Sequence, residues 1–325
     1  MRSSQIGNEA RLMQMSDRIG KRLKLQDLHV LMTVVQAGSM GKAALMLNTT
    51  QPNISRSIGG LEQAFGVRLL DRHQKGIEPT ECGRALLDCG AAVFDELRQG
   101  VKSIESLADP TAGEVRIGST AFLAASFVCA LIDRLSRRHP RIRFQLVTGY
   151  IEALHRDLSE RKVDLLIVRS AGAIADDRLR FEFLFEDHYV VVAGVTNRLA
   201  RRRKIQFPEL ADEAWVLPPR ESVIGSILLE AFRDAGLEYP YATVVTDSPH
   251  MRVSLLATGR FITVFPASAL RFLAKEAALK VLPVDLPKAR RPNGIVTLKD
   301  RALSPVARLV IDSAREFAKP MAKQT

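Results

Sequence analysis

The sequence predicts an α/β protein overall, with a mainly helical module in its N-terminal third, and three observations support this. Apolar residues recur at helical spacing through residues 25–107, apart from a short strand-like stretch at residues 67–79. Beyond residue 114, strand-like and helix-like segments alternate, as they do in an open α/β sheet. Between these regions, the segment DPTAG at residues 109–113 is a break and a candidate hinge.

Composition and charge exclude several classes of protein. A chain of 325 residues with 46% hydrophobic and 26% charged residues is typical of a soluble protein with two or three domains. No apolar run approaches the ~20 residues that a membrane span needs, and residues 1–23 lack the apolar core of a signal peptide. We therefore expect a cytoplasmic protein with no membrane partner. The net charge of +11 is weak evidence for a nucleic acid, because residues 1–110 contribute only +2.

Three helices are predicted at the start of the N-terminal module. The first covers residues 25–37, and the second, capped by Ser39, covers residues 40–48. The third begins at Gln51-Pro52, where proline suits the first helical turn. Its apolar residues recur at the spacing of one helix face, so we expect that face to be buried and the opposite face to be free: Ile54, Ile58, Leu61 and Phe65.

The second and third helices form a candidate helix-turn-helix. Two helices that cross steeply need small residues where they meet, and Ala43-Ala44 supply them. The second helix of such a motif projects polar side chains into the major groove of DNA, where Gln and Asn pair with adenine and Arg with guanine. An ordinary helical hairpin with a polar surface is the competing interpretation at this point. The free face of the third helix carries a suitable polar set: Gln51, Asn53, Ser55 and Arg56.

A wing and a long helix follow this motif. Residues 67–79 predict two short strands around His73 to Gly76, and Thr80 caps a helix that runs to about residue 108. The apolar residues of this helix have roughly the spacing of a coiled-coil seam, which requires a partner helix. They are Leu86, Val93, Leu97, Val101, Ile104 and Ala108.

The runs SMGKAALMLNTTQPNISRSIGGLEQAFGVRLLDR and PTECGRALL resemble the winged helix-turn-helix of LysR-type transcriptional regulators. The resemblance is specific over residues 25–108 and extends more diffusely to about residue 318. It implies that the protein is a sequence-specific DNA-binding regulator and that Arg72 and His73 lie on the wing, against phosphate or the minor groove. It also implies that the third helix meets DNA through Thr50, Gln51, Pro52, Ser55 and Arg56.

The resemblance implies the domain order as well. We expect a disordered leader (1–23), a winged helix-turn-helix (24–79), a linker and dimerisation helix (80–108), a hinge (109–114) and an effector-binding domain (115–318). The last resembles a periplasmic binding protein, with two α/β subdomains and a cleft at the carboxyl ends of their strands. A closing helix over residues 304–318 could return to either subdomain.

Candidate effector residues follow the predicted strands of this last domain. Ser119 and Thr120 open a helix, whose N-terminus suits an anion, and Thr148 and Arg169 follow the next two strands. Hydroxyl groups with an arginine suit a carboxylate, such as an aromatic or sugar acid, and we expect no cofactor. A helix cap or loop residue is the competing interpretation at each position. The second subdomain supplies Ser222, Thr246, Asp247 and Phe265.

The expected partners are double-stranded operator DNA, the small-molecule effector and a second copy of the chain. The family implies a homodimer or homotetramer, and contact with RNA polymerase if the protein is an activator. An allosteric change at the hinge would pass the effector signal to the DNA-binding heads.

Two other classes of protein are weighed against this one. An enzyme lacks support because the six histidines are scattered and no nucleotide-binding glycine motif occurs. Cys82 and Cys89, seven residues apart, are a redox pair in principle, but small residues in a helix seam explain them more simply. A free-standing solute-binding protein would need export and would leave residues 25–108 without a role.

Overall fold

The computed structural model describes residues 23–73, 76–109, 112–169, 176–270, 278–284, 286 and 290–322. The predicted disordered leader therefore lies outside the described residues, except Leu23, and so do residues 110 and 111 of the predicted hinge. The chain divides into two compact units, Met1–Arg98 and Gln99–Thr325. Across the described ranges, no helix is long and apolar enough to cross a membrane.

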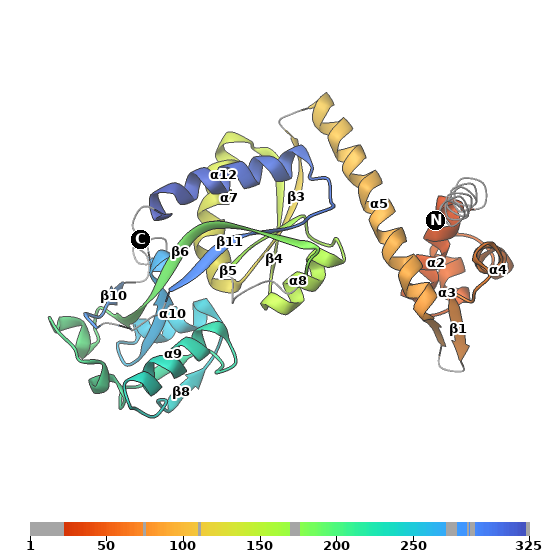
Figure 1. The fold of residues 1–325 in the computed structure, drawn as a ribbon. Helices are drawn as coiled ribbons and strands as arrows, with labels where there is room; N and C mark the ends of the chain where they lie inside the picture. Colours follow the sequence, from red (N-terminus) through yellow and green to blue (C-terminus); the bar gives the residue numbers. More distant parts are fainter. Residues whose placement is uncertain are drawn as a thin grey trace, which may run out of the picture. The chain divides into compact units, whose positions relative to one another are not determined.

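The first unit packs three helices and a hairpin against the start of a long helix (Figure 1). Ser39 caps α3 by accepting a hydrogen bond from the Lys42 amide at 3.1 Å, as predicted. Ala43 is fully buried, so small side chains do lie where α3 and α4 approach each other. The elements are α2 (Leu25–Ala37), α3 (Met40–Met46), α4 (Gln51–Phe65), β1 (Leu70–His73), β2 (Gly76–Pro79) and α5 (Glu81–Ala108).

The second unit is built on one sheet, whose described strands run in the order β4-β3-β5-β11-β6-β9-β7-β8, with β10 paired to β6. Its first half contains β3 (Ala112–Ser119), α6 (Ala121–Leu123), the π-helical turn η1 (Ala124–Val128), α7 (Cys129–Arg138), β4 (Arg141–Thr148), α8 (Ile151–Ser159) and β5 (Leu165–Arg169). The rest comprises β6 (Leu179–Gly194), η2 (Arg198–Arg201), η3 (Phe207–Leu210), β7 (Trp215–Leu217), α9 (Val223–Asp234), β8 (Ala242–Val245), α10 (Pro249–Ala257), β9 (Ile262–Pro266), β10 (Leu279–Val281), β11 (Arg290–Leu298) and α12 (Pro305–Ala322).

The strand β6 joins two subdomains that have separate cores. Its residues Leu179 to His188 pair with β11 beside the first core, and Tyr189 to Ala193 pair with β9 beside the second. In Figure 1, β6 and β11 run together along the middle of this unit. The closing helix α12 packs on the first subdomain, because its buried residues share one apolar core with β3 and α7.

The parallel strands place their carboxyl ends at comparable heights within each subdomain. Ser119 at the end of β3 is the register partner of Thr148 at the end of β4, and β5 ends at Arg169. In the second subdomain β7 is parallel to both β8 and β9. The candidate effector residues therefore gather along the strand ends of the two subdomains, at what we call the subdomain junction. We define the junction by the contacts that cross it, between Tyr150 and Asp247 and between Phe122 and Phe265.

Two glycines of α5 should respond oppositely to alanine. A Cβ at Gly83 would lie 2.0 Å from the Leu69 carbonyl oxygen, so we expect Gly83→Ala to lower the free energy of unfolding by about 1–3 kcal/mol. A Cβ at Gly100 would meet nothing within 4 Å, and Gly100→Ala should instead stabilise the helix by about 1 kcal/mol. Urea unfolding of the full chain, followed by circular dichroism, measures both changes. Equal effects at the two positions would contradict the packing of α5 on Leu69.

Candidate DNA-reading face and effector site

The helix α4 presents one buried face and one polar face. Ile54, Ile58 and Leu61 are buried in the core of the first unit, as their spacing predicts. Phe65, which was expected on the same buried face, is 43% exposed because it is the last residue of the helix. Thr50, the N-cap residue, is exposed and its side chain makes no capping hydrogen bond, so its hydroxyl is available. The candidate DNA-contacting residues on the helix are exposed except for Ser55, which is half-buried: Gln51, Pro52, Asn53, Ser55 and Arg56.

A chain of hydrogen bonds orders the polar face of α4. The Asn53 amide nitrogen donates to the Thr49 hydroxyl at 3.2 Å, and Arg56 Nη1 donates to the Asn53 amide oxygen at 3.2 Å. The guanidinium is thereby held over the N-terminal half of the helix, the part that reaches base edges in helix-turn-helix proteins. Ordering these side chains before binding reduces the conformational entropy that is lost when they contact DNA.

The wing is fixed to α4 by hydrogen bonds and carries an exposed arginine and an exposed histidine. Glu62 accepts hydrogen bonds from the amides of Leu69 (2.9 Å) and Leu70 (3.4 Å), which fixes the start of β1 against α4. Arg72 and His73 are exposed on β1. The wing tip, residues 74 and 75, lies outside the described residues.

The predicted effector residues of the first subdomain differ in how far their side chains are exposed. Ser119 is fully buried and its hydroxyl donates to the Ile167 carbonyl at 2.6 Å, so this group ties β3 to β5 rather than facing a ligand. Thr120 precedes α6 without a side-chain capping bond, and Thr148 is exposed. Arg169 is only 7% exposed.

In the second subdomain, two of the predicted effector residues accept hydrogen bonds from backbone amides close to them in the chain. Ser222 accepts from the Gly225 amide at 3.1 Å and caps α9, while Thr246 accepts from the Ser248 amide at 3.2 Å. Asp247 accepts a hydrogen bond from the Tyr150 hydroxyl, which reaches it from the first subdomain. This bond to the carboxylate raises the pKa of Tyr150 above its usual value.

A second buried arginine, Arg252 on α10, lies at the junction and was not identified from the sequence. Its Nε and Nη2 donate to the Thr263 hydroxyl at 3.1 and 2.7 Å, and Nη2 also donates to the Val264 carbonyl at 2.8 Å. Its Cζ lies 5.0 and 5.1 Å from the ring centroids of Phe122 and Phe265. Burial lowers the pKa of Arg252 to about 9, so the group remains charged at neutral pH.

Three further residues at the junction were not identified from the sequence. Tyr189 and Asn293 are buried there, whereas the hydroxyl of the exposed Tyr150 crosses it. The sequence signal for Arg252 was weak, because the stretch SPHMRVSLLA mixes polar and apolar residues and an arginine in such a stretch is usually exposed. Asn293 gave no signal, since its place depends on how β11 pairs. Within the described ranges, no group of three His, Cys, Asp or Glu side chains is arranged to hold a metal ion.

Comparison with known protein families identifies the chain. Residues 25–84 match the family described as bacterial regulatory helix-turn-helix protein, lysR family. Residues 108–319, more than half of the chain, match the LysR substrate binding domain. The chain belongs to the LysR family. LysR-family proteins are DNA-binding transcriptional regulators with an effector-binding domain, and they are not enzymes. The two competing classes, an enzyme and a free-standing solute-binding protein, are therefore excluded.

Curated relatives and solved structures agree with this assignment. The regulator GbpR of Azospirillum brasilense is 25% identical over 295 residues, covering 90% of this chain and 86% of its own length. TdcA of Escherichia coli K12 is 25% identical over 297 residues, covering 91% and 93%. A full-length OxyR variant from Pseudomonas aeruginosa has the same fold, with a TM-score of 0.66 and 20% identity over 93% of this chain and 99% of that one. CbnR in complex with its target DNA matches with a TM-score of 0.53 and 18% identity, over 91% and 100%.

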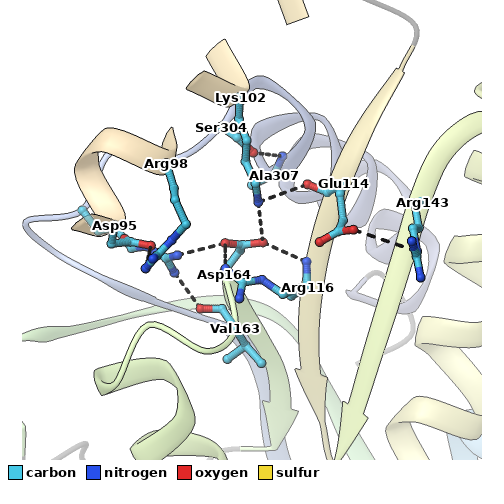
Figure 2. Close-up of polar contacts among 11 residues, drawn as sticks. Asp95, Arg98, Lys102, Glu114, Arg116, Arg143, Val163, Asp164, Ser304 and Ala307 are labelled. Carbon is cyan, nitrogen blue, oxygen red and sulfur yellow. Dashed lines mark hydrogen bonds and ion pairs between the residues drawn. The ribbon is translucent and has the colours of Figure 1, made fainter. Parts of the chain in front are cut away.

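A buried carboxylate connects the end of α5 to the effector-binding domain of this LysR-family regulator. Asp164 is 2% exposed and forms an ion pair with the fully buried Arg301, whose Nη2 lies 2.9 Å from Oδ1. The Arg116 amide donates to Asp164 at 2.8 Å, and Lys102 Nζ of α5 lies 3.7 Å away. Figure 2 shows Lys102, Arg116 and Val163 around this carboxylate. The contact with Lys102 fixes the last turns of α5 to β3 and β5.

Removing the charge of Asp164 should destabilise the second unit strongly. Asp164→Asn removes the buried carboxylate that pairs with Arg301 and lies near Lys102, so we expect the free energy of unfolding to fall by about 3–5 kcal/mol. Asp133→Asn is the matched control, because Asp133 pairs with Arg137 at the surface and its loss should change stability little. Urea unfolding of both variants measures the difference. Similar unfolding midpoints would contradict a central role for the buried pair.

Proposed function

We propose that α4 enters the major groove of operator DNA and reads base edges through Gln51, Asn53, Ser55 and Arg56. Thr50 and Pro52 lie at the start of the helix, where we expect contacts with the sugar-phosphate backbone. Arg72 and His73 on the wing contact phosphate or the minor groove. The observation that carries this proposal is the polar face of α4. Its side chains are exposed and are joined to one another by hydrogen bonds before any DNA binds, while the opposite face of the helix is apolar and buried.

The proposal includes a homodimer held together through α5. The sequence predicts a coiled-coil seam on this helix, and three residues in the C-terminal half of the seam are exposed: Leu97 (49%), Val101 (55%) and Ile104 (68%). Leu107, outside the predicted seam, is also exposed (82%). Such large apolar side chains gain free energy when a partner helix covers them. A dimer presents two α4 helices to two half-sites related by a two-fold axis, and pairing of dimers gives a homotetramer.

We further propose that a small-molecule effector binds at the subdomain junction and changes how the two subdomains are arranged. Thr120, Thr148 and Arg169 from the first subdomain, with Ser222, Thr246, Asp247 and Phe265 from the second, are the candidate effector residues, with Ser119 in a supporting position. The Asp164–Lys102 contact then offers a route by which the change reaches α5. As an activator the protein would also contact RNA polymerase.

Footprinting with purified protein and promoter fragments tests the placement of α4. Arg56→Ala should weaken binding to the operator by about 1–3 kcal/mol and relax the sequence preference, because a bidentate contact with a base is lost. Arg56→Lys keeps the charge but not the planar pair of donors, so it should lose most of the same discrimination. Arg137→Ala removes an exposed charge from the second unit and serves as the control. Unchanged footprints with Arg56→Ala would refute this role of α4.

Analytical ultracentrifugation tests the role of α5. Ile104→Glu places a charge on the exposed apolar face of the helix, so we expect monomers in place of dimers and weaker binding to paired half-sites. Asp88→Ala, at an exposed position on the opposite face of α5, should leave the oligomeric state unchanged. A dimer that survives Ile104→Glu would show that the chains associate through another surface.

A further inference from the structure

Two buried arginines at the subdomain junction form no ion pair with a carboxylate of the described residues. Arg252 is fully buried and Arg169 is 7% exposed. Within the described parts of the chain, neither guanidinium forms an ion pair, and Arg169 Nε and Nη2 and Arg252 Nη1 have no hydrogen-bond partner. A buried cation without a counter-ion lowers the stability of a fold, and protein structures generally pair such groups.

The unpartnered atoms belong to one connected region. Asn293 on β11 is the register partner of Arg169 on β5, and both polar atoms of its buried amide lack a hydrogen bond. The Arg169 guanidinium lies 5.0 Å from the ring centroid of Tyr189, whose buried hydroxyl is also unpartnered. Tyr189 on β6 is the register partner of Pro266 on β9, and the neighbouring Phe265 has its ring centroid 5.1 Å from Arg252 Cζ. The region therefore extends from β11 through β5 and β6 to α10.

The carboxylates near this region are already engaged. Asp187 is buried, and its two oxygens accept hydrogen bonds from the amide and the hydroxyl of Ser268. Asp247 accepts from the hydroxyl of Tyr150. These bonds direct the oxygens of both carboxylates to other groups, and among the described residues no carboxylate forms an ion pair with Arg169 or Arg252. The donors that remain unused are Arg169 Nε and Nη2 and Arg252 Nη1, beside the Tyr189 hydroxyl and the Asn293 amide.

We propose that this region binds a small dicarboxylate, with one carboxylate on Arg169 and the other on Arg252. The inference rests on the proposed function, because it names the chemical class of the effector. Arg169 offers Nε and Nη2, the two parallel donors that hold a carboxylate in a bidentate pair. Arg252 offers Nη1, while its other nitrogens hold Thr263 and Val264. Tyr189 and Asn293 complete the lining and take further polar groups of the ligand.

The geometry gives the ligand a regulatory role as well. Arg169 belongs to β5 in the first subdomain, and Arg252 belongs to α10 in the second. A dicarboxylate held at both ends therefore bridges the subdomains and favours the arrangement in which both guanidiniums reach it. The aromatic pair Phe122–Phe265, with centroids 4.9 Å apart, encloses Arg252 from both subdomains and strengthens its electrostatic contacts by excluding water.

Calorimetric titration of the full chain with a panel of simple acids tests this proposal. The panel contains oxalate, succinate, adipate and phthalate, which differ in the spacing of their carboxylates, with butyrate and succinamide as singly charged and neutral controls. We expect at least one dicarboxylate to bind about 10-fold more tightly than either control, since each charge-assisted hydrogen bond adds affinity. Dicarboxylates that bind no better than butyrate would overturn the proposal.

Three matched variants separate ligand binding from a structural role. Arg169→Met and Arg252→Met keep much of the side-chain volume and should each weaken the preferred dicarboxylate at least about 10-fold. The thermal unfolding midpoint of ligand-free Arg169→Met should stay the same or rise, because a buried charge that forms no ion pair is removed. Arg252→Met also loses the hydrogen bonds to Thr263 and Val264, so its titrations are run well below its own unfolding midpoint. Arg260→Met is the control, since Arg260 also stacks on a ring, that of Phe261, but is exposed. Wild-type affinity in both Arg169→Met and Arg252→Met would overturn the assignment.

The same samples distinguish a failure of this inference from a failure of the proposed function. A wild-type protein that protects operator DNA but does not distinguish dicarboxylates from the controls contradicts the ligand assignment alone. A wild-type protein that protects no genomic fragment contradicts the placement of α4, whatever the titrations give.

Discussion

The antiparallel pairing of β6 with β11 is the constraint on which the effector-binding domain depends. These strands pair from Leu179 to His188, and β6 then continues into the second subdomain beside β9. Because the continuous strand β6 runs from one subdomain into the other, we expect a change in their arrangement to bend this strand rather than slide one core past the other. Tyr189 is held at the junction by the pairing of β6 with β9, and Asn293 by the pairing of β11 with β5 and β6. The lining of the proposed ligand site is thus part of the sheet rather than of a loop.

The buried charged side chains of this domain are of two kinds, those with an ion-pair partner and those without one. Asp164 is matched by Arg301 and by the Arg116 amide, so it stabilises the region where α5 joins the domain. At the junction, Arg169 on β5 and Arg252 on α10 form no ion pair with any described carboxylate, and each keeps at least one unused donor. A buried charge with an ion-pair partner stabilises the local structure around it. A buried charge without such a partner is stabilised when a ligand of opposite charge binds. The domain therefore has a firm attachment to α5 and a responsive region at the junction.

Local patterns predicted the fold well, and the comparisons confirm its class. The buried face of α4 followed from the spacing of Ile54, Ile58 and Leu61, because helical periodicity is a property of neighbouring residues. The ligand region depends instead on pairings between distant segments. Ser119 donates to Ile167, 48 residues away, and this contact could not be deduced from its position at a helix start. Arg252 was passed over because an arginine in a helix is usually at the surface.

The unmatched guanidiniums also bear on how long the protein survives in a cell. A ligand that binds only the folded state adds its binding free energy to the stability of that state. Proteases remove proteins in proportion to the fraction that is transiently unfolded, so a small gain in stability can change abundance several-fold. If a dicarboxylate neutralises Arg169 and Arg252, its supply would set the amount of regulator as well as its conformation. Regulator level and regulator activity would then rise and fall together with one metabolite.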